Sequence, residues 1–379
     1  MDYKLLLKYH QYIQREISVS EPKTLFSRIA SEIYRFSLKS MSIVVGGFLT
    51  RIFGIKSKKV DILVFNTNKI DFQNTELIWN ILKERGYSVR LVLPSVKQLF
   101  LAALFFRDKL KIPYKIYYWS VFSRYLIKKF EPGIICSFKS YDVMPSFLRK
   151  HAQASCKTVF LPHGLQPPIH LYTSFDYDYY LAFGKGGLKC IEDNKLRIGS
   201  TKVILSGSPI IKKHYSLDPG KPTKNILFFS DWWIEKNYQN TVRNLEIVID
   251  WAKENPDYKL LIKLHPSEKG EFIKDQVNSI QNITVLDKSI SMVEALINIS
   301  ICITAWSVAS IEAALLNRPT VVVNHLEYDE SSDNYIQSDK YLYIESFFPR
   351  RAVNSSELKL RIEQVLKNYD YYLEQCKKF

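Results

Sequence analysis

The chain has 379 residues, enough for two domains of ordinary size, and its 46% hydrophobic and 24% charged residues are typical of a folded globular protein. The first 20 residues are polar and charged without an apolar run, so we expect no secretory signal. The formal net charge is +15, which suits an anionic partner such as a nucleoside diphosphate, a nucleic acid or an anionic membrane surface.

Residues 1–55 predict a basic, helical extension ahead of the first strand. Within it, the stretch 41–55 is the most membrane-like, but it is too short to span a bilayer and is interrupted by Gly46, Gly47 and Arg51. Basic residues flank this stretch. It fits an interfacial helix on an anionic leaflet, and it equally fits a helix buried against the N-terminal domain, so both interpretations stay open.

Residues 56–214 predict an N-terminal Rossmann-like domain. Apolar, β-branched runs alternate with segments of helical spacing, and Pro113 divides residues 97–130 into two helices. The predicted strands are 60–65, 87–94, 133–138, 157–164, 178–184 and 201–209.

Residues 215–224 predict a linker, because they contain Pro219, Gly220 and Pro222 without apolar periodicity. Alternation then resumes in a C-terminal Rossmann-like nucleotide-donor domain, 225–353, followed by a C-terminal helix, 354–379, able to pack back on the N-terminal domain. The predicted strands of this part are 225–231, 258–266, 283–287, 300–306, 319–324 and 341–344.

Alternating strands and helices with short connections predict parallel sheets covered by helices, so the fold class is α/β with two Rossmann-like domains and a cleft between them. No GxGxxG pattern follows the first strand of either half, which gives little support to a nicotinamide cofactor. The five cysteines are scattered, odd in number and without a CxxC pair, so we expect small buried residues in a reducing compartment.

Polar residues gather where strands of the second half end. His265 and Pro266 close one predicted strand, and Ser307, Ser310 and Glu312 open the helix after another. In a parallel sheet these positions share one edge, where helix N-terminal amides and hydroxyls can hold a phosphate and a carboxylate can accept both ribose hydroxyls. Each residue also has an ordinary explanation as a turn or a helix cap.

Ser230 and Asp231 end the first strand of the second half, on the same predicted edge. They are candidates for contact with phosphate or base, although Asp231 could instead cap the following helix. Trp232 and Trp233 could stack on a base or sugar, but we favour core packing for both.

The His-Pro pair followed by the pattern SxxSxEAxxxxRP resembles glycosyltransferases of the GT-B fold that build bacterial surface polysaccharides. The group includes capsule sialyl- and polysialyltransferases, Kdo transferases and CDP-glycerol glycerophosphotransferases. The resemblance covers about residues 157–325. It implies that the HP and serine motifs hold the donor's phosphate and nucleotide and that Glu312 binds the ribose. Asn317 stands where such proteins often have glycine, a mild departure.

The same resemblance points to residues of the first half. His163, in LPHG, matches a functionally important histidine of the glycerophosphotransferase-like relatives and is a candidate general base. Asp142 lies about where sialyltransferase-like relatives place a catalytic aspartate, but its flanking residues do not reproduce their motif. Ser208, near the domain crossover, matches a hinge segment with possible donor contact.

The implied activity is a glycosyltransferase that moves a sugar from a nucleotide-activated donor to a hydroxyl of a growing capsule or lipopolysaccharide glycan. The motifs favour a CMP-activated sialic, Kdo or other nonulosonic acid. The alternatives are a CDP-glycerol-type polyol-phosphate transferase, an epimerase of the same architecture and a non-catalytic anion-binding protein.

The expected partners are a nucleotide-sugar donor, a glycan or glycolipid acceptor and an anionic membrane surface. We expect no cofactor, no metal and no nucleic acid, because HxH, HExxH, RNP-like and helix-turn-helix patterns are missing from the sequence. The expected location is the cytoplasm, peripheral on the inner face of the cytoplasmic membrane.

Overall fold

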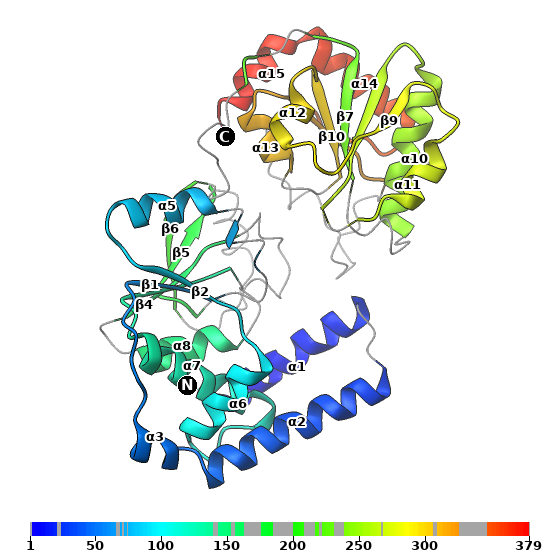
Figure 1. Ribbon diagram of the computed structural model, residues 1–379. Coiled ribbons are helices and arrows are strands. Elements are labelled where there is room, and N and C mark those ends of the chain that lie inside the picture. The colour runs from blue at the N-terminus through cyan, green and yellow to red at the C-terminus, as the bar shows by residue number, and fades with distance from the viewer. Residues whose placement is uncertain are drawn as a thin grey trace. The chain divides into compact units, whose positions relative to one another are not determined.

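The chain divides into two compact units, Met1–Ile210 and Ile211–Phe379, with a boundary close to the expected linker. Each unit is an α/β fold with its own sheet, and each is described by itself (Figure 1). The computed structural model describes residues 2–20, 24–65, 69, 72–73, 75–138, 143–152, 156–162, 176–184, 200–207, 217–219, 222–230, 239–266, 268–305, 309–325 and 347–378.

Unit 1 is built on a six-stranded sheet of order β2-β1-β3-β4-β5-β6, in which every neighbouring pair is parallel. All six strands predicted from the sequence are present, and β1 is buried along its whole length, as expected for an inner strand of a helix-covered sheet, whereas the edge strand β6 is mostly exposed. The strands are β1 (Ile62–Phe65), β2 (Val89–Val92), β3 (Ile134–Ser137), β4 (Lys157–Phe160), β5 (Tyr179–Ala182) and β6 (Lys202–Leu205).

The helices of unit 1 begin where the sequence supplies starting signals. Ser95 and Gln98 form a capping box at the start of α6 (Val96–Phe105). Pro113 precedes α7 (Tyr114–Phe130) with φ −57°, so the predicted interruption of residues 97–130 is confirmed. The other helices that connect strands of this sheet are α5 (Glu76–Glu84) and α8 (Met144–Ala152).

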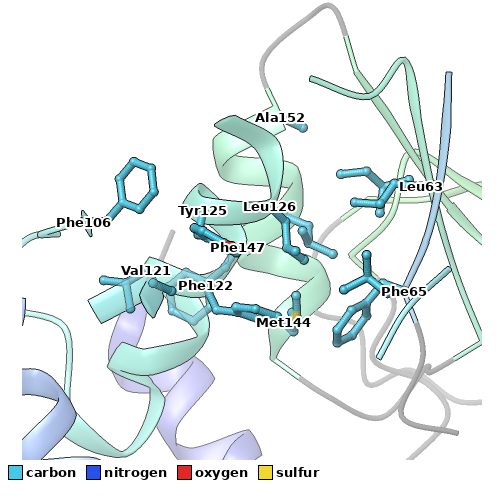
Figure 2. Packing of buried hydrophobic residues seen from close by; sticks show 14 of the residues in the cluster. Leu63, Phe65, Phe106, Val121, Phe122, Tyr125, Leu126, Met144, Phe147 and Ala152 are labelled. Atoms are coloured by element: carbon cyan, nitrogen blue, oxygen red, sulfur yellow. The ribbon is translucent and has the colours of Figure 1, made fainter. Parts of the chain in front are cut away.

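The main core of unit 1 lies between the sheet and the pair α7 and α8 (Figure 2). Leu63 and Phe65 of β1 point toward Leu126 of α7 and Met144 of α8, and all four side chains are buried. Phe65 and Phe122 meet edge to face, with ring centroids 6.3 Å apart. The high aromatic content of the chain is therefore used for core packing in this unit.

The N-terminal extension forms three helices, as the sequence predicted for residues 1–55. They are α1 (Tyr3–Ser20), α2 (Leu25–Val44) and α3 (Phe48–Phe53). Within the described part of the chain, no helix combines the length and the apolar character needed to cross a membrane.

Unit 2 contains a five-stranded parallel sheet of order β11-β10-β7-β8-β9. Its first strand, β7, lies in the middle, and the chain order reverses between β7 and β10, as in the Rossmann arrangement. The strands are β7 (Asn225–Phe229), β8 (Lys259–Lys263), β9 (Ile283–Val285), β10 (Ile301–Thr304) and β11 (Thr320–Val322). The strand predicted at 341–344 lies outside the described residues.

Helices cover both faces of this sheet, with α12 and α13 on one side and α10 on the other (Figure 1). Leu227 and Phe229 of β7 pack against Leu296 of α12 and Ala313 of α13. The helices of unit 2 are α10 (Gln239–Glu254), α11 (Glu271–Val277), α12 (Met292–Leu296), α13 (Ala309–Leu315), α14 (Ser355–Lys367) and α15 (Tyr369–Cys376).

The C-terminal segment consists of two helices rather than the single predicted one, because Asn368, with φ −118° and ψ 40°, separates α14 from α15. Leu358 and Ile362 of α14 are buried, and the Tyr369 hydroxyl of α15 donates a 3.1 Å hydrogen bond to the Ser300 carbonyl just before β10. Both helices thus pack within unit 2.

Candidate functional site

The candidate site lies at the carboxyl ends of β7 and β8, which are neighbours in the sheet. Ser230 follows β7 and His265 follows β8. The Ser230 amide donates to the Lys263 carbonyl at 3.1 Å, and the His265 amide donates to the Ser230 hydroxyl oxygen at 2.9 Å. The two strand ends are therefore held together beside the reversal of strand order, where α/β sheets bind their ligands.

Glu268 connects the Ser230 hydroxyl to the backbone of the His265 turn through two hydrogen bonds. The Ser230 hydroxyl donates a hydrogen bond to Glu268 Oε2, and the Glu268 amide donates to the His265 carbonyl at 3.0 Å. Both Ser230 and Glu268 are buried. The Ser230 hydroxyl, which we had considered for donor contact, is thus engaged in fixing the turn that presents His265 and Pro266.

The His265 imidazole is half-buried at this edge. Burial lowers its pKa below the ordinary value, and the positive charge of Lys288, which follows β9, lowers it further. The ring is therefore neutral at neutral pH in the absence of a ligand. It can donate one N–H to a phosphate oxygen, and a bound anion would favour its protonation.

Lys263, the last residue of β8, adds a half-buried ammonium to the same edge. Its Nζ donates to the Ile290 carbonyl at 2.5 Å. Burial lowers the pKa of Lys263, whereas the carboxylates of Asp287, Glu294 and Glu312 act in the opposite direction. The electrostatic interaction with Glu312 connects the end of β8 to the first turn of α13.

Ser310 and Glu312 lie in the first turn of α13, as the sequence predicted. Ser310 is fully buried, whereas Glu312 is half-exposed. Ser307 precedes the helix and lies outside the described residues. The edge thus brings together the ends of β7 and β8 and the first turn of α13, and these segments carry Ser230, His265, Pro266, Ser310 and Glu312 of the residues predicted for donor binding.

The NRP sequence after α13 has a structural role. Asn317 adopts φ +56°, a left-handed conformation in which glycine is the usual residue, and this explains the glycine expected at that position. Arg318 is 2% exposed and donates hydrogen bonds to five backbone carbonyls, those of Leu296, Ile297, Leu316, Asn317 and Asp218. The guanidinium ties α12, α13 and the segment before β7 together.

The residues predicted in the first half, His163, Asp142 and Ser208, lie outside the described residues, as do Asp231, Trp232 and Trp233. The strands that precede Asp142 and His163 are β3 and β4, which are adjacent and parallel. The interdomain cleft and the choice between these two residues as general base stay predictions.

Four of the five cysteines, Cys136, Cys156, Cys302 and Cys376, are described, and all four are free and buried. Burial raises the pKa of Cys136 to about 12 and that of Cys376 to about 12. These thiols are small core residues, as predicted. In the part of the chain that the structure describes, no group of three or more His, Cys, Asp or Glu side chains could hold a metal ion.

Two contributors to the site were not predicted. Glu268 follows the His-Pro pair by two residues, and Lys263 precedes it by two. Both are charged residues, which are ordinarily assigned to the surface. The only sequence signal was their closeness to His265.

Residues 211–379 match the family described as CDP-Glycerol:Poly(glycerophosphate) glycerophosphotransferase. This stretch comprises all of unit 2, with the His265 turn and the first turn of α13. The match confirms the group of relatives predicted from the His-Pro and serine motifs, and the chain is an enzyme of the transferase class. No curated protein sequence matches the chain.

Solved structures with the same fold confirm the predicted GT-B architecture. UDP-GlcNAc 2-epimerase from Neisseria meningitidis, bound to UDP-GlcNAc, aligns with TM-score 0.51 and 14% identity over 83% of this chain and 93% of that chain. MnaA from S. aureus, solved with UDP, aligns with TM-score 0.51 and 12% identity over 84% of this chain and 91% of that chain.

Proposed function

We propose that the protein is a polyol-phosphate transferase that uses a CDP-glycerol-type donor. The observation that carries this proposal is the glycerophosphotransferase match over residues 211–379, which contain the His265 turn, Lys263 and the first turn of α13. The alternative that we raised from the sequence is therefore preferred to a CMP-activated nonulosonic acid as donor.

In the proposed reaction an acceptor hydroxyl attacks the β-phosphorus of the donor. The new P–O bond forms a phosphodiester, the phosphoanhydride bond breaks, and CMP leaves with the bonding electrons, while the acceptor proton passes to a general base. His163 is our first candidate for that base and Asp142 the second. No glycosidic bond is made or broken.

The residues of unit 2 would bind the leaving nucleotide. His265 would donate its ring N–H to a phosphate oxygen, and the Lys263 ammonium, together with Lys288, would offset negative charge on the same edge. The Ser307 hydroxyl would add a donor to the phosphate, the buried Ser310 would hold the first turn of α13 in place, and Glu312 would accept the ribose hydroxyls. The UDP and UDP-GlcNAc bound by proteins of the same fold support a nucleotide as the ligand of this chain.

We further propose that these side chains stabilise the leaving phosphate without a metal ion. The measurement is turnover after treatment with EDTA. Unchanged turnover is expected, whereas a loss that Mg²⁺ or Mn²⁺ restores would overturn this part of the proposal.

The donor can be identified by combining nucleotide binding with product analysis. CMP and CDP-glycerol should raise the midpoint of thermal unfolding more than UDP or GDP, because a ligand that binds only the folded state stabilises it. With CDP-glycerol and a polyol-phosphate acceptor, ³¹P NMR should detect CMP and a new phosphodiester. Transfer from CMP-sialic acid or CMP-Kdo, with a glycosidic product and no turnover of CDP-glycerol, would overturn the proposal in favour of the sugar donors.

The acceptor belongs to the same proposal. We propose a glycan or glycolipid that carries a free hydroxyl and is held at the inner face of the cytoplasmic membrane. The exposed apolar and basic surface of unit 1, described next, supports that location. Fractionation of cells should recover the protein with membranes at low salt and release part of it at high salt.

A further inference from the structure

An apolar stripe faces solvent along α2. Ile29, Ile33, Phe36 and Val44 are spaced by four, three and eight residues, so they share one side of the helix. They are 50%, 62%, 62% and 81% exposed. The opposite side packs on unit 1 through Leu38, which is 3% exposed. In an ordinary surface helix the outward side is polar, so an apolar outward side on α2 is unusual.

The short helix α3 continues this apolar surface. None of its residues is buried, and Phe48, Ile52 and Phe53 are 60%, 55% and 74% exposed. We call the exposed apolar residues of both helices the α2–α3 surface; they are Ile29, Ile33, Phe36, Val44, Phe48, Ile52 and Phe53. A contiguous group of solvent-exposed apolar residues marks an interaction site, whereas single exposed apolar residues are ordinary.

The turn between the two helices is locked in place against the end of α6. A Cβ atom on Gly46 would lie 2.2 Å from the Ser42 carbonyl oxygen and 2.5 Å from that of Phe106, so only glycine fits. Gly47 adopts φ +91°, and its amide donates to the Phe105 carbonyl at 3.0 Å. The hydroxyl of Thr50 also donates to Phe105. The apolar side chains of α3 are thus presented on a fixed backbone.

The segment that carries the α2–α3 surface is basic, and Arg51, Lys56, Lys58 and Lys59 are exposed within or just after α3. Within residues 25–60 there are seven basic residues and a single acidic one, Glu32. Glu32 is paired with Arg35 and Lys115 on the packed side of α2. The basic residues are Arg28, Arg35, Lys39, Arg51, Lys56, Lys58 and Lys59.

A cavity of about 750 Å³ opens beside the turn. Four cationic side chains line it, those of Arg51, Arg107, Arg124 and Lys128, against the single carboxylate of Glu131. Its apolar wall includes Val44 and Phe48 of the α2–α3 surface. A cation-lined hollow that opens onto an apolar rim matches a lipid phosphate whose acyl chains continue into a bilayer.

We propose that the α2–α3 surface docks on an anionic phospholipid bilayer and that the adjoining cavity receives a lipid phosphate. The exposed apolar side chains would enter the boundary between headgroups and acyl chains, while the exposed basic residues Arg51, Lys56, Lys58 and Lys59 face the headgroups. We favour an anionic bilayer because its phosphates would interact favourably with these cations. A second copy of this basic chain would be repelled by them, and a neutral apolar partner would leave them without counter-charges. The sequence had left the stretch 41–55 open between a buried and an interfacial helix, and its exposure favours the interfacial one.

Co-sedimentation with vesicles tests the proposal on the full-length protein. The protein should bind vesicles that contain phosphatidylglycerol and should bind pure phosphatidylcholine vesicles at least about tenfold more weakly. The double variant Phe48→Ser/Phe53→Ser should lower the affinity for the anionic vesicles by about tenfold or more. The matched control is Leu360→Ser/Tyr371→Ser on α14 and α15, which removes two residues of similar exposure, 59% and 58%, and should leave binding unchanged.

A charge-reversal pair tests the cavity. Each cation near an anionic surface raises the affinity about fivefold. Reversing two of them with Arg51→Glu/Lys128→Glu should therefore weaken binding to anionic vesicles by more than about tenfold. Lys359→Glu/Lys367→Glu, at two exposed cations of α14 in unit 2, provides the matched change in net charge. If both pairs weaken binding equally, the cavity has no special role and that part of the proposal is overturned.

Three further outcomes would overturn the bilayer as the occupant. They are no binding to anionic vesicles, unchanged binding by the Phe48→Ser/Phe53→Ser variant, or a dimer in light scattering that this variant converts to a monomer. The last result would assign the surface to contact between copies of the chain. Thermal unfolding and nucleotide-induced stabilisation should match the wild type in every variant, since all the substituted side chains are exposed and none belongs to the strand ends or to the first turn of α13 that form the nucleotide site.

Discussion

The Ser230 hydroxyl accepts a 2.9 Å hydrogen bond from the His265 amide and donates one to the buried Glu268 carboxylate. A single side chain at the end of β7 thus fixes the turn at the end of β8. This relationship explains why a small hydroxyl residue occupies a position that is 2% exposed. It also makes the geometry of the His-Pro turn dependent on the neighbouring strand.

Ser230→Ala should destabilise the protein and weaken nucleotide binding together. The substitution removes one partner from the His265 amide and one from the Glu268 carboxylate, and a lost buried hydrogen bond of this kind costs about 1–3 kcal/mol. Urea unfolding and the dissociation constant of CDP-glycerol measure the two effects. Ser57→Ala, at an exposed position, is the control. Unchanged values in Ser230→Ala would contradict the role we give the hydroxyl.

Nucleotide binding should be coupled to protonation of His265. In the free protein its pKa is lowered by burial and by Lys288, whereas a phosphate anion beside the ring would raise it. Between those two pKa values the complex holds a proton that the free protein lacks, so affinity should increase as the pH falls from 8 towards 6, by at most tenfold per pH unit.

CDP-glycerol is the suitable ligand for this measurement, because each of its two phosphates carries a single, strongly acidic hydroxyl that does not titrate in this range. Calorimetry in two buffers of different ionisation enthalpy should detect proton uptake by the wild type. His265→Asn keeps an N–H donor but cannot take up a proton, so its affinity should change little with pH. An equal pH dependence in both proteins would show that His265 is not the group involved.

The strands and their parallel arrangement were predictable because the signal is local. Runs such as 60–65 and 300–306 are apolar, β-branched and bounded by polar turns, and each lies in a sheet. The same holds for His265 and Glu312, whose positions follow from where a strand ends and a helix begins. Burial of charge is not local: Glu268 and Arg318 are buried because residues distant in sequence supply their partners. The exposure of α3 was likewise undecided until its neighbours were known.

Acidification should reduce stability through His10 on α1. This imidazole is 3% exposed, and burial, followed by the charges of Arg35 and Lys115, lowers its pKa to about 4. In the unfolded chain the pKa is about 6.5. Between about pH 6.5 and 4 the unfolded state binds the proton and the folded state does not, so stability falls as the pH is lowered through this window, by up to about 3 kcal/mol.

His10→Leu should remove this contribution. The difference in unfolding free energy between pH 7 and pH 5 should be smaller in the variant than in the wild type, as measured by urea unfolding at both values. Other histidines, such as His151, titrate in both proteins, so their contributions cancel in the comparison. An equal loss of stability in the two proteins would contradict the assignment to His10.

Arg318→Lys should be strongly destabilising although it preserves the charge. The guanidinium satisfies five carbonyls on three separate segments, and its planar donors cannot be reproduced by one ammonium group. Loss of several buried hydrogen bonds around a retained charge should cost about 3 kcal/mol or more. Urea unfolding gives the measurement, and Arg243→Lys, at a side chain 58% exposed, should change stability by less than about 0.5 kcal/mol. Because Arg318 adjoins α13, the destabilised protein should also bind nucleotide more weakly. Equal stability of the two variants would mean that the carbonyls find other partners and that the NRP sequence is retained for a different reason.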